Sequence, residues 1–370
     1  MKKTLVLLII ISFIWACSKV DNQHINTLSE PVLPQNVYDY LANKNVAGRD
    51  INSPTDNKTN NYGATLGRVL FYDVRLSINN ATSCGSCHQQ IFAFADNVSL
   101  SRGMALQQTQ RNTPAIINCM QKRNFFWDQR VTKLEDMVTK PIQNHIEMGF
   151  EDMDKLAEKL KSVSYYPALF KKTFGNEIVT KERISYALAQ FLRSMATFNS
   201  KSDKVGRREE SYTAIELEGK RLFDNSSCSD CHSFNGSSYS ALGSANIGLD
   251  KNDADKGIRR LQTSTSNTGI VTYTQVEGMF SIPSLRNIAL SAPYMHDGRF
   301  KTLEEVINHY STGIQANPSL SHTLIKWNTG QPVRFNFSEQ DKKALIAFLN
   351  AFTDWDFIAN PMFSDPFPKK

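Results

Sequence analysis

The pentapeptide CGSCH occupies residues 84–88, and a second copy of its pattern, CSDCH, occupies residues 228–232. With 6 Cys and 7 His among 370 residues, random placement would give about 0.002 such matches, so the pair is not accidental. Two thiols separated by two residues reach the two vinyl groups of one porphyrin, and the following histidine supplies an imidazole to its iron. The residues predicted to hold two covalently bound haem c groups are Cys84, Cys87, His88, Cys228, Cys231 and His232.

Two other chemistries use paired cysteines of this spacing. Zinc sites built from four cysteines contain Cys-x-x-Cys, and so do redox-active dithiols. Neither chemistry explains a histidine directly after each pair. We therefore interpret both motifs as haem sites.

The amino terminus predicts export, which agrees with haem c because this group is attached outside the cytoplasm. Two lysines precede an apolar run over residues 5–16 that is too short to span a bilayer and suits a signal-peptide core. The run ends at Cys17 in a sequence that resembles a bacterial lipobox. We expect residues 1–17 to be a lipoprotein-type signal peptide and the mature chain to be periplasmic, held at the membrane only by lipid on Cys17. An ordinary cleaved signal and an uncleaved anchor are the alternatives.

Composition excludes several classes of protein. The net charge of +6 is mild and the basic residues are interspersed with acidic ones, so the chain does not resemble a nucleic-acid-binding protein. Hydrophobic residues make up 41%, enough for the cores of two domains, and no later segment is apolar enough to cross a membrane. Cys119 lies outside the haem motifs and the lipobox, and we interpret it as a buried small hydrophobe.

An internal repeat indicates two related domains. GRVLFYD at residues 67–73 precedes the first haem motif, and GKRLFD at residues 219–224 precedes the second. The preceding residues 18–61 are polar and rich in Asn and Asp, which predicts a spacer. We expect the two haem domains to occupy residues 62–205 and 206–370.

The spacing of apolar residues is helical over most of the chain. It predicts a helix over residues 153–160 and further helices beginning after Thr180, Thr213, Thr302 and Ser338. The helices after Thr213 and Thr302 are each expected to begin with a capping box.

The fold class predicted from these patterns is mainly α, with two cytochrome c-like haem domains in tandem. No segment shows the sustained two-residue alternation of a strand. Residues 237–275 are dense in Gly, Ser, Asn and Asp, and we expect them to form a long ordered loop beside the second haem.

Several short phrases surround the two motifs in a fixed order. They are LGR at 66–68, FAFAD at 92–96, RNTPA at 111–115, FFWD at 125–128, PI at 141–142 with EM at 147–148, IPSLRN at 282–287 and APYMHDG at 292–298. Together they resemble the bacterial di-haem cytochrome c peroxidase family, which includes the MauG-type enzymes. The similarity covers roughly residues 62–355.

The resemblance implies a role for each domain. The amino-terminal domain is expected to be peroxidatic, with His88 as proximal ligand and Glu147 moving a proton between the peroxide oxygens. The carboxyl-terminal domain is expected to receive and store electrons. Trp127 corresponds to the tryptophan that the family places between the two haems. Asn112, with carbonyls near Ser281 and Pro283, matches the family's interdomain calcium position.

Two residues depart from the family pattern around the first haem. Where the peroxidases carry a histidine that caps the peroxidatic iron, this chain has Met104. We favour an open site over ligation by Met104, as in MauG-type relatives, because a loop methionine is more often a packing residue. Where relatives often place a glutamine beside the distal pocket, this chain has Met137.

The sixth ligand of the second haem separates the subtypes. Met295 would give the Met/His ligation of cytochromes c, which raises the haem potential. Alignment of the helix after Thr302 instead places Tyr310 where the peroxidases have their ligand methionine, and tyrosine is the residue that MauG-type enzymes use. We expect Tyr310 to be the ligand.

The function predicted is that of an exported di-haem oxidoreductase of the cytochrome c peroxidase type. It would reduce hydrogen peroxide with electrons from a small redox protein or another periplasmic donor, passed from the carboxyl-terminal to the amino-terminal haem. The alternatives are a MauG-like oxidase of an organic or protein substrate and a non-catalytic di-haem electron carrier. Glu147 and an open distal side argue against the carrier, and the resemblance leaves a homodimer open.

Overall fold

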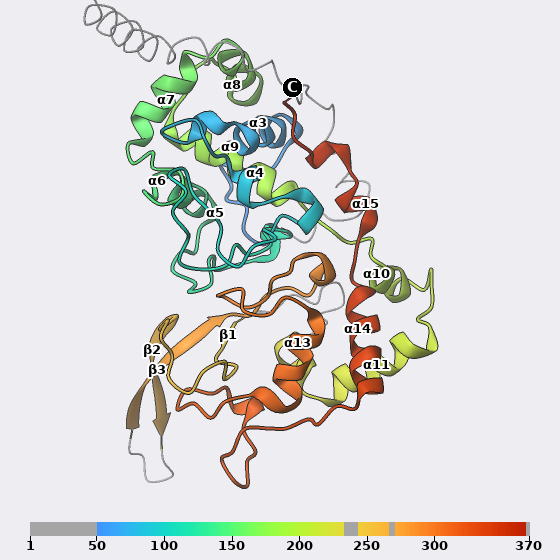
Figure 1. The fold of residues 1–370 in the computed structure, drawn as a ribbon. Coiled ribbons are helices and arrows are strands. Elements are labelled where there is room, and N and C mark those ends of the chain that lie inside the picture. The colour runs from blue at the N-terminus through green and yellow to red at the C-terminus, as the bar shows by residue number, and fades with distance from the viewer. Residues whose placement is uncertain (1–49, 233–242, 266–270, 368–370) are drawn as a thin grey trace, which may run out of the picture.

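The computed structural model describes residues 50–232, 243–265 and 271–367, with side chains described outside residues 260–274. Two helical lobes lie end to end, and a small sheet lies beside the second lobe (Figure 1). The mainly α class with cytochrome c-like domains is therefore confirmed. The predicted signal peptide and Cys17 lie outside the described residues, as do residues 18–49 of the predicted spacer.

The first lobe is built around two crossing helices, α3 and α9. Its helices are α3 (Asn61–Tyr72), α4 (Cys84–Cys87), α5 (Leu134–Met137), α6 (Thr139–Gln143), α7 (Met153–Lys161), α8 (Tyr166–Phe174) and α9 (Lys181–Ser194). Phe71 packs edge-on against Phe94 and Phe191, and all three side chains are buried. This aromatic cluster joins the two helices to the segment that follows the first haem motif.

The second lobe repeats this arrangement with α11 and α14. Its helices are α11 (Ala214–Asn225), α12 (Cys228–Cys231), α13 (Leu303–Asn308), which continues as a π-helical turn (His309–Gly313), and α14 (Glu339–Asn350). Phe348 packs edge-on against Phe223 and Phe352 in its core. The lobes are connected through α10 (Lys201–Gly206).

The repeat predicted from the sequence is reproduced in the packing of the helix pairs. A Cβ on Gly67 of α3 would lie 2.0 Å from the Ala187 carbonyl oxygen of α9, and one on Gly219 of α11 would lie 1.9 Å from that of Ala344 on α14. Each helix pair therefore approaches closely only because glycine has no side chain at the crossing point. The same contact in both lobes explains why the glycine recurs before each haem motif.

The helices begin where their caps predict. Thr180 caps α9 through its hydroxyl, and capping boxes at Thr213, Thr302 and Ser338 begin α11, α13 and α14. The helix predicted over residues 153–160 is α7. These predictions are confirmed. A helix start can be predicted from the sequence because it depends on residues within one or two turns of it.

The prediction of a strandless loop over residues 237–275 is wrong. β1 (Ser244–Ala245), β2 (Ile258–Thr265) and β3 (Val271–Ser281) form an antiparallel sheet in the order β1-β3-β2. β3 begins Val-Thr-Tyr-Thr, and such β-branched and aromatic residues favour strands even without an apolar alternation. Apolar alternation by itself therefore does not indicate this strand.

The prediction that the spacer extends to residue 61 is also wrong for its last residues. Asn57 is buried, with its amide bonded to the side chains of Glu135 and Gln190. The Asn52 amide donates to the carbonyl oxygens of Cys119 and Lys122. Residues 50–60 are thus a strap fixed to the first lobe, because their polar side chains satisfy buried backbone and side-chain groups.

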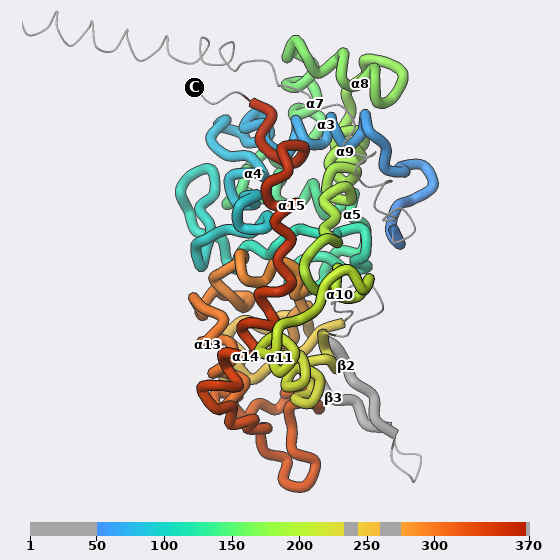
Figure 2. The backbone as a smooth tube through the Cα atoms, turned by 90° about the vertical axis from the view of Figure 1, so that its right-hand side faces the viewer, coloured from blue at the N-terminus to red at the C-terminus, as the bar shows by residue number. Residues whose placement is uncertain are grey.

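After α14 the chain returns to the first lobe, as the red tube of Figure 2 shows. The helix α15 (Trp355–Ile358) and a short 3₁₀ turn (Pro361–Phe363) bring Phe357 and Phe363 into the first core, where both are fully buried. The division into domains between residues 205 and 206 stays a prediction. Residues 355–363 fall in its second domain, but Phe357 and Phe363 pack in the core of the first lobe.

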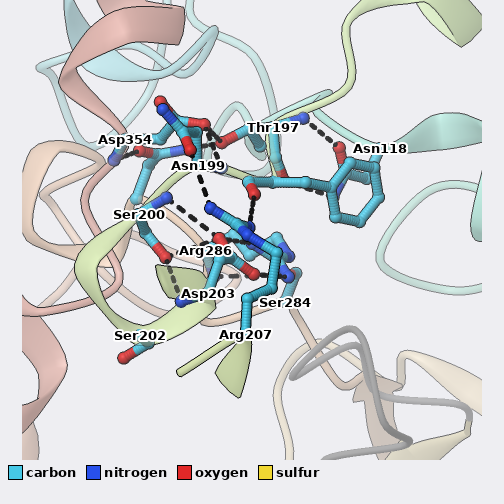
Figure 3. Close-up of polar contacts among 12 residues, drawn as sticks. Asn118, Thr197, Asn199, Ser200, Ser202, Asp203, Arg207, Ser284, Arg286 and Asp354 are labelled. Carbon is cyan, nitrogen blue, oxygen red and sulfur yellow. Dashed lines mark hydrogen bonds and ion pairs between the residues drawn. The ribbon is translucent and has the colours of Figure 1, made fainter. Parts of the chain in front are cut away.

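A buried polar cluster lies where the chain passes between the lobes (Figure 3). Arg286 forms a two-point ion pair with Asp203, with both N–O distances 2.7 Å. The Thr197 hydroxyl donates to the carboxylate of Asp354 at 2.8 Å. Since Thr197 precedes α10 and Asp354 follows α14, the outgoing and returning connections are held to each other.

Candidate functional site

The first haem motif forms the short helix α4 and ends at His88. A capping box between Ser83 and Ser86 fixes its start. The ring of His88 contacts the Phe94 carbonyl oxygen through Nδ1 at 2.8 Å, and a carbonyl can only accept, so Nδ1 carries the proton. Burial lowers the pKa of His88, which favours the neutral ring. Nε2 is therefore left with a lone pair that can bind a metal.

The second motif also forms a short helix, α12, that ends at a histidine, although Ser227 before it has a left-handed backbone and forms no capping box. His232 donates from Nδ1 to the Pro283 carbonyl oxygen at 3.1 Å, and burial lowers its pKa to about 4. This bond ties the motif to the IPSLRN phrase 51 residues further along the chain.

The residues of both motifs fit a haem c. All four motif cysteines are free thiols, as thioether formation requires, and each histidine is neutral with Nε2 available. A Cβ on Gly85 would lie 2.5 Å from the ring of Tyr72, so only glycine allows α4 to pack against α3 at this point. Two such sites on two related helical lobes define a c-type cytochrome with two haem sites.

Glu147 lies close to the first motif. Its Oε1 accepts a hydrogen bond from Asn144 Nδ2 at 2.8 Å, and burial raises its pKa. Burial chiefly, and the neighbouring Cys87 and Glu147 in addition, raise the pKa of the Cys84 thiol to about 12. The structure therefore brings a half-buried carboxyl to the side of the first motif, although Glu147 and Cys84 are far apart in the sequence.

The loop that carries Glu147 is held by the segment around Met104. The Met104 N–H donates to the Glu147 carbonyl oxygen at 2.8 Å, and a Cβ on Gly103 would lie 1.7 Å from the Ile146 carbonyl oxygen. A Cβ on Gly149 would lie 2.8 Å from the methyl group of the methionine side chain. Met137 is buried on α5 within the first core. The preference for an open iron over Met104 ligation stays a prediction.

Trp127 lies at the contact between the lobes. Its indole Nε1 donates to the Asn112 carbonyl oxygen at 2.8 Å, and its own carbonyl accepts from the N–H of Ser281 at 2.7 Å. The Asn112 N–H in turn donates to the His296 carbonyl oxygen at 2.7 Å. Trp127 and Asn112 are therefore hydrogen-bonded to each other, and each also has a backbone hydrogen bond to the second lobe.

Sequence reasoning missed Arg111 as a member of this contact. Its guanidinium makes a two-point ion pair with Asp255 of the second lobe and a further ion pair with Asp128 of the first. These bonds, to Asp255 above all, raise the pKa of Arg111 above its usual range. The guanidinium also lies over the ring of Phe280, which stacks on His296 with centroids 3.6 Å apart.

Only part of that contact had a signal in the sequence. Arg111 and His296 stand inside two of the quoted family phrases, so their position there could have drawn attention to them. Asp255 lies 144 residues from Arg111 in a polar stretch, and no local pattern relates the two.

The Asn112 side chain has the chemistry expected of a calcium ligand. Its Nδ2 donates to the carbonyl oxygens of Val98 and Ser99, which leaves Oδ1 as the atom that could bind a cation. The Pro283 carbonyl of the expected site accepts from His232. Calcium at this position stays a prediction.

Tyr310 lies next to the second motif, in the π-helical turn after α13. Burial first, and the nearby Cys228 and Cys231 next, raise the pKa of its hydroxyl well above the usual value. Met295, the other expected ligand, packs on the edge of the second core and has a left-handed backbone with φ 75°. His309 donates from Nε2 to the Ile247 carbonyl oxygen at 2.9 Å, because a carbonyl can only accept.

Comparisons with known proteins agree with this class. Residues 61–211 match the family model described as di-haem cytochrome c peroxidase, and residues 217–352 match that of cytochrome c. The chain is 36% identical to the cytochrome c551 peroxidase of Nitrosomonas europaea over 66% of its own length and 71% of that protein. It is 32% identical to the methylamine utilization protein MauG of Methylorubrum extorquens, over 77% of this chain and 76% of that one.

A solved structure is similar over most of the molecule. It is the crystal structure of a MauG-like protein associated with microbial copper homeostasis, with a TM-score of 0.72 and 31% identity over 85% of this chain and 96% of that one. The chain therefore belongs to the di-haem cytochrome c peroxidase and MauG family, and it is an oxidoreductase of the cytochrome c peroxidase type. Within the described residues, no helix has both the length and the apolar character needed to cross a bilayer.

Proposed function

We propose that this protein is an exported di-haem peroxidase that reduces hydrogen peroxide to water. Electrons enter at the carboxyl-terminal haem from a small redox protein and pass to the amino-terminal haem. Each turnover breaks one O–O bond and consumes two electrons and two protons, so that one peroxide yields two waters. The site must therefore supply both an electron route and a proton route.

The observation that carries this proposal is the difference between the two haem motifs. A half-buried carboxyl, Glu147, lies beside the first motif, and a half-buried phenol, Tyr310, lies beside the second. A protein that only carried electrons would gain nothing from a proton-accepting group at one site. The asymmetry supports one reactive site and one electron-storing site.

The motif residues would hold the two haems, with Cys84, Cys87 and His88 at the first. Bound haem supplies the one-electron redox chemistry that amino-acid side chains lack. Glu147 would take a proton from one peroxide oxygen and return it to the departing oxygen, which otherwise would leave as a costly anion. Asn144 holds the carboxyl through Oε1, which orients its other oxygen for this transfer.

Trp127 would lie on the electron route between the lobes. Its indole is fixed by the Asn112 carbonyl and its backbone by Ser281, so that the ring has one orientation relative to both lobes. The ion pairs of Arg111 with Asp128 and Asp255 keep the lobes in register around it.

Tyr310 favours a second candidate function, a MauG-like oxidase that draws electrons from an organic or protein substrate. A phenolate ligand favours ferric and higher oxidation states, so an enzyme with Tyr310 on the iron would hold oxidising equivalents longer. In that case the electrons would still pass through the second lobe to the first.

An optical and EPR titration of the purified holoprotein with peroxide tests these functions. A spectral reaction of the fully oxidised protein would support an open first site and the MauG-like version. A reaction that requires prior half-reduction would support the peroxidase mechanism with a capped iron. Absence of any reaction in both redox states would reject catalysis and leave the electron carrier.

The remaining parts of the proposal concern location and calcium. We infer export to the periplasm, with lipid on Cys17 as the anchor, from the leader sequence. Calcium at Asn112 would stiffen the contact between the lobes, because hard oxygen ligands there come from both lobes. Metabolic labelling with a fatty acid, compared in Cys17→Ala, tests the anchor.

A further inference from the structure

A loop between α13 and α14 projects from the end of the second lobe that lies away from the first lobe (Figures 1 and 2). Its returning arm is fastened to the π-helical turn that carries Tyr310. The Asn336 N–H donates to the Ser311 carbonyl oxygen at 3.1 Å, and the Phe337 N–H donates to the Ser311 hydroxyl at 2.9 Å. The base of the loop is therefore part of the second haem lobe.

The tip of this loop holds an exposed tryptophan on a fixed turn. Backbone bonds run from the Lys326 N–H to the Gln331 carbonyl and from the Gly330 N–H to the Lys326 carbonyl, both at 2.8 Å. Gly330 adopts φ 67°, which favours glycine. Trp327 is 95% exposed, more than any other large hydrophobic residue among those described. Such exposure of a tryptophan on an ordered turn is typical of a binding residue.

The same loop carries positive charge alone. Between Ile314 and Ser338 there is no Asp or Glu, while Lys326 begins the tip, Arg334 follows it and His322 precedes it. Lys326 is exposed, whereas Arg334 is half-buried and donates from Nη1 to the Val333 carbonyl oxygen at 2.9 Å; neither takes part in an ion pair within the described side chains. The charge at the tip is therefore available to an acidic partner.

The loop also leads directly to the second haem motif. Burial raises the pKa of the Cys231 thiol, and the side chain of Thr323, four residues before the exposed tryptophan, lies close enough to oppose that rise. Leu324 is buried with Ile314 and Leu320 in a small cluster against which Tyr310 packs. A partner that held the tip would thus be placed over the wall of the second site.

We propose that the tip, residues 326–331 with the exposed Trp327, is the docking surface for an acidic small redox protein that delivers electrons to the second haem. The proposal rests on the proposed function, since it names where the donor binds. Lys326 and Arg334 attract the donor electrostatically before contact, and the indole of Trp327 packs against the surface of the donor once the two proteins meet. A loop used for membrane attachment would not need its connection to Cys231 and Tyr310, so the donor is the better occupant.

Two variants and a matched control test the surface. Trp327→Ala and Lys326→Glu alter the tip, and Trp355→Ala removes another exposed tryptophan, which is 65% exposed on α15. Peroxide turnover of each holoprotein is measured with an acidic cupredoxin and with ascorbate plus a small phenylenediamine mediator. We expect the KM for the cupredoxin to rise about tenfold in each tip variant, with turnover by the small reductant unchanged and Trp355→Ala like wild type.

A binding measurement separates this proposal from the proposed function. Calorimetric titration with the acidic cupredoxin at low salt should show binding that the tip variants weaken and that a basic cytochrome c does not reproduce. Equal binding by wild type and Trp327→Ala, or preference for the basic probe, would overturn the docking surface even if peroxide is reduced. Loss of binding to anionic vesicles in the tip variants, with donor binding unchanged, would assign the tip to a membrane instead. Wild-type protein that binds the cupredoxin but consumes no peroxide with either reductant would overturn the proposed function alone.

Discussion

The indole of Trp127 is bonded to the backbone carbonyl of Asn112 at 2.8 Å, and this bond sets the ring at the contact between the two haem lobes. Both residues are also connected to the second lobe through backbone bonds, Trp127 to Ser281 and Asn112 to His296. One side chain therefore takes part in the fold and in the proposed electron route. The structural role and the role in electron transfer can be tested by substitution, because phenylalanine keeps an aromatic ring at this position but lacks the indole N–H.

Trp127→Phe should slow electron transfer between the haems while leaving both haems attached. The hydrogen bond to Asn112 is lost, and the cost to the free energy of unfolding should be only about 1 kcal/mol. Stopped-flow spectra of the half-reduced protein after mixing with peroxide measure the transfer rate. Phe125→Leu, a change in the first core, is the control for a general loosening of the fold. An unchanged rate in Trp127→Phe would remove the residue from the route.

Glu147→Gln should reduce peroxide turnover by about 10²- to 10⁴-fold, the usual contribution of a positioned proton-transfer group. Gln keeps the size of the side chain and can still accept from Asn144, so haem content and the thermal midpoint should stay close to wild type. Steady-state turnover measures the effect. Glu151→Gln, at an exposed position nearby, is the matched control and should behave as wild type.

The pH dependence of turnover should report Glu147. Burial raises the pKa of this carboxyl above its ordinary value, and the group must be ionised to accept a proton from peroxide. Turnover should therefore fall as the pH drops through the raised pKa, at a pH above the usual value of about 4.3 for glutamate. The acidic limb of the pH profile should disappear in Glu147→Gln. A limb that persists in this variant belongs to another group.

Tyr310→Phe should change the optical and EPR spectra of the second haem, and Met295→Leu should leave them unchanged. Tyr310 lies half-buried beside Cys228 and Cys231, whereas Met295 lies at the edge of the second core. Spectra of the oxidised holoproteins decide between the two residues. The opposite result, with Met295→Leu altering the spectrum and Tyr310→Phe silent, would give the ligand role to the methionine.

Asp203→Asn should destabilise the fold by about 3–5 kcal/mol, because it leaves the buried Arg286 guanidinium without its counter-charge. The two side chains are 9% and 2% exposed, so water cannot replace the lost carboxylate. Denaturant unfolding of the holoprotein measures the loss. Glu218→Gln breaks an ion pair on the surface of α11 with Arg221 and should cause no measurable change.

The sequence by itself determined the features that are written in neighbouring residues. Each haem motif is five consecutive residues, so its chemistry can be recognised without any knowledge of the fold. The caps at Thr180, Thr213 and Ser338 begin their helices for a similarly local reason, since a side-chain oxygen bonds a backbone N–H three residues ahead. The glycine before each motif also marks a repeat that the packing reproduces.

The tertiary structure alone decided which distant residues meet. Arg111 and Asp255 pair across 144 residues, and the return of Phe357 and Phe363 to the first core depends on the whole path of the chain. The carbonyl oxygens that orient His88 and His232 come from backbone, which leaves no mark in the sequence. Local energies specify where a helix starts and where a porphyrin is attached. The contacts between lobes arise only when folding brings remote segments together and buries their polar groups, so each must find a partner there.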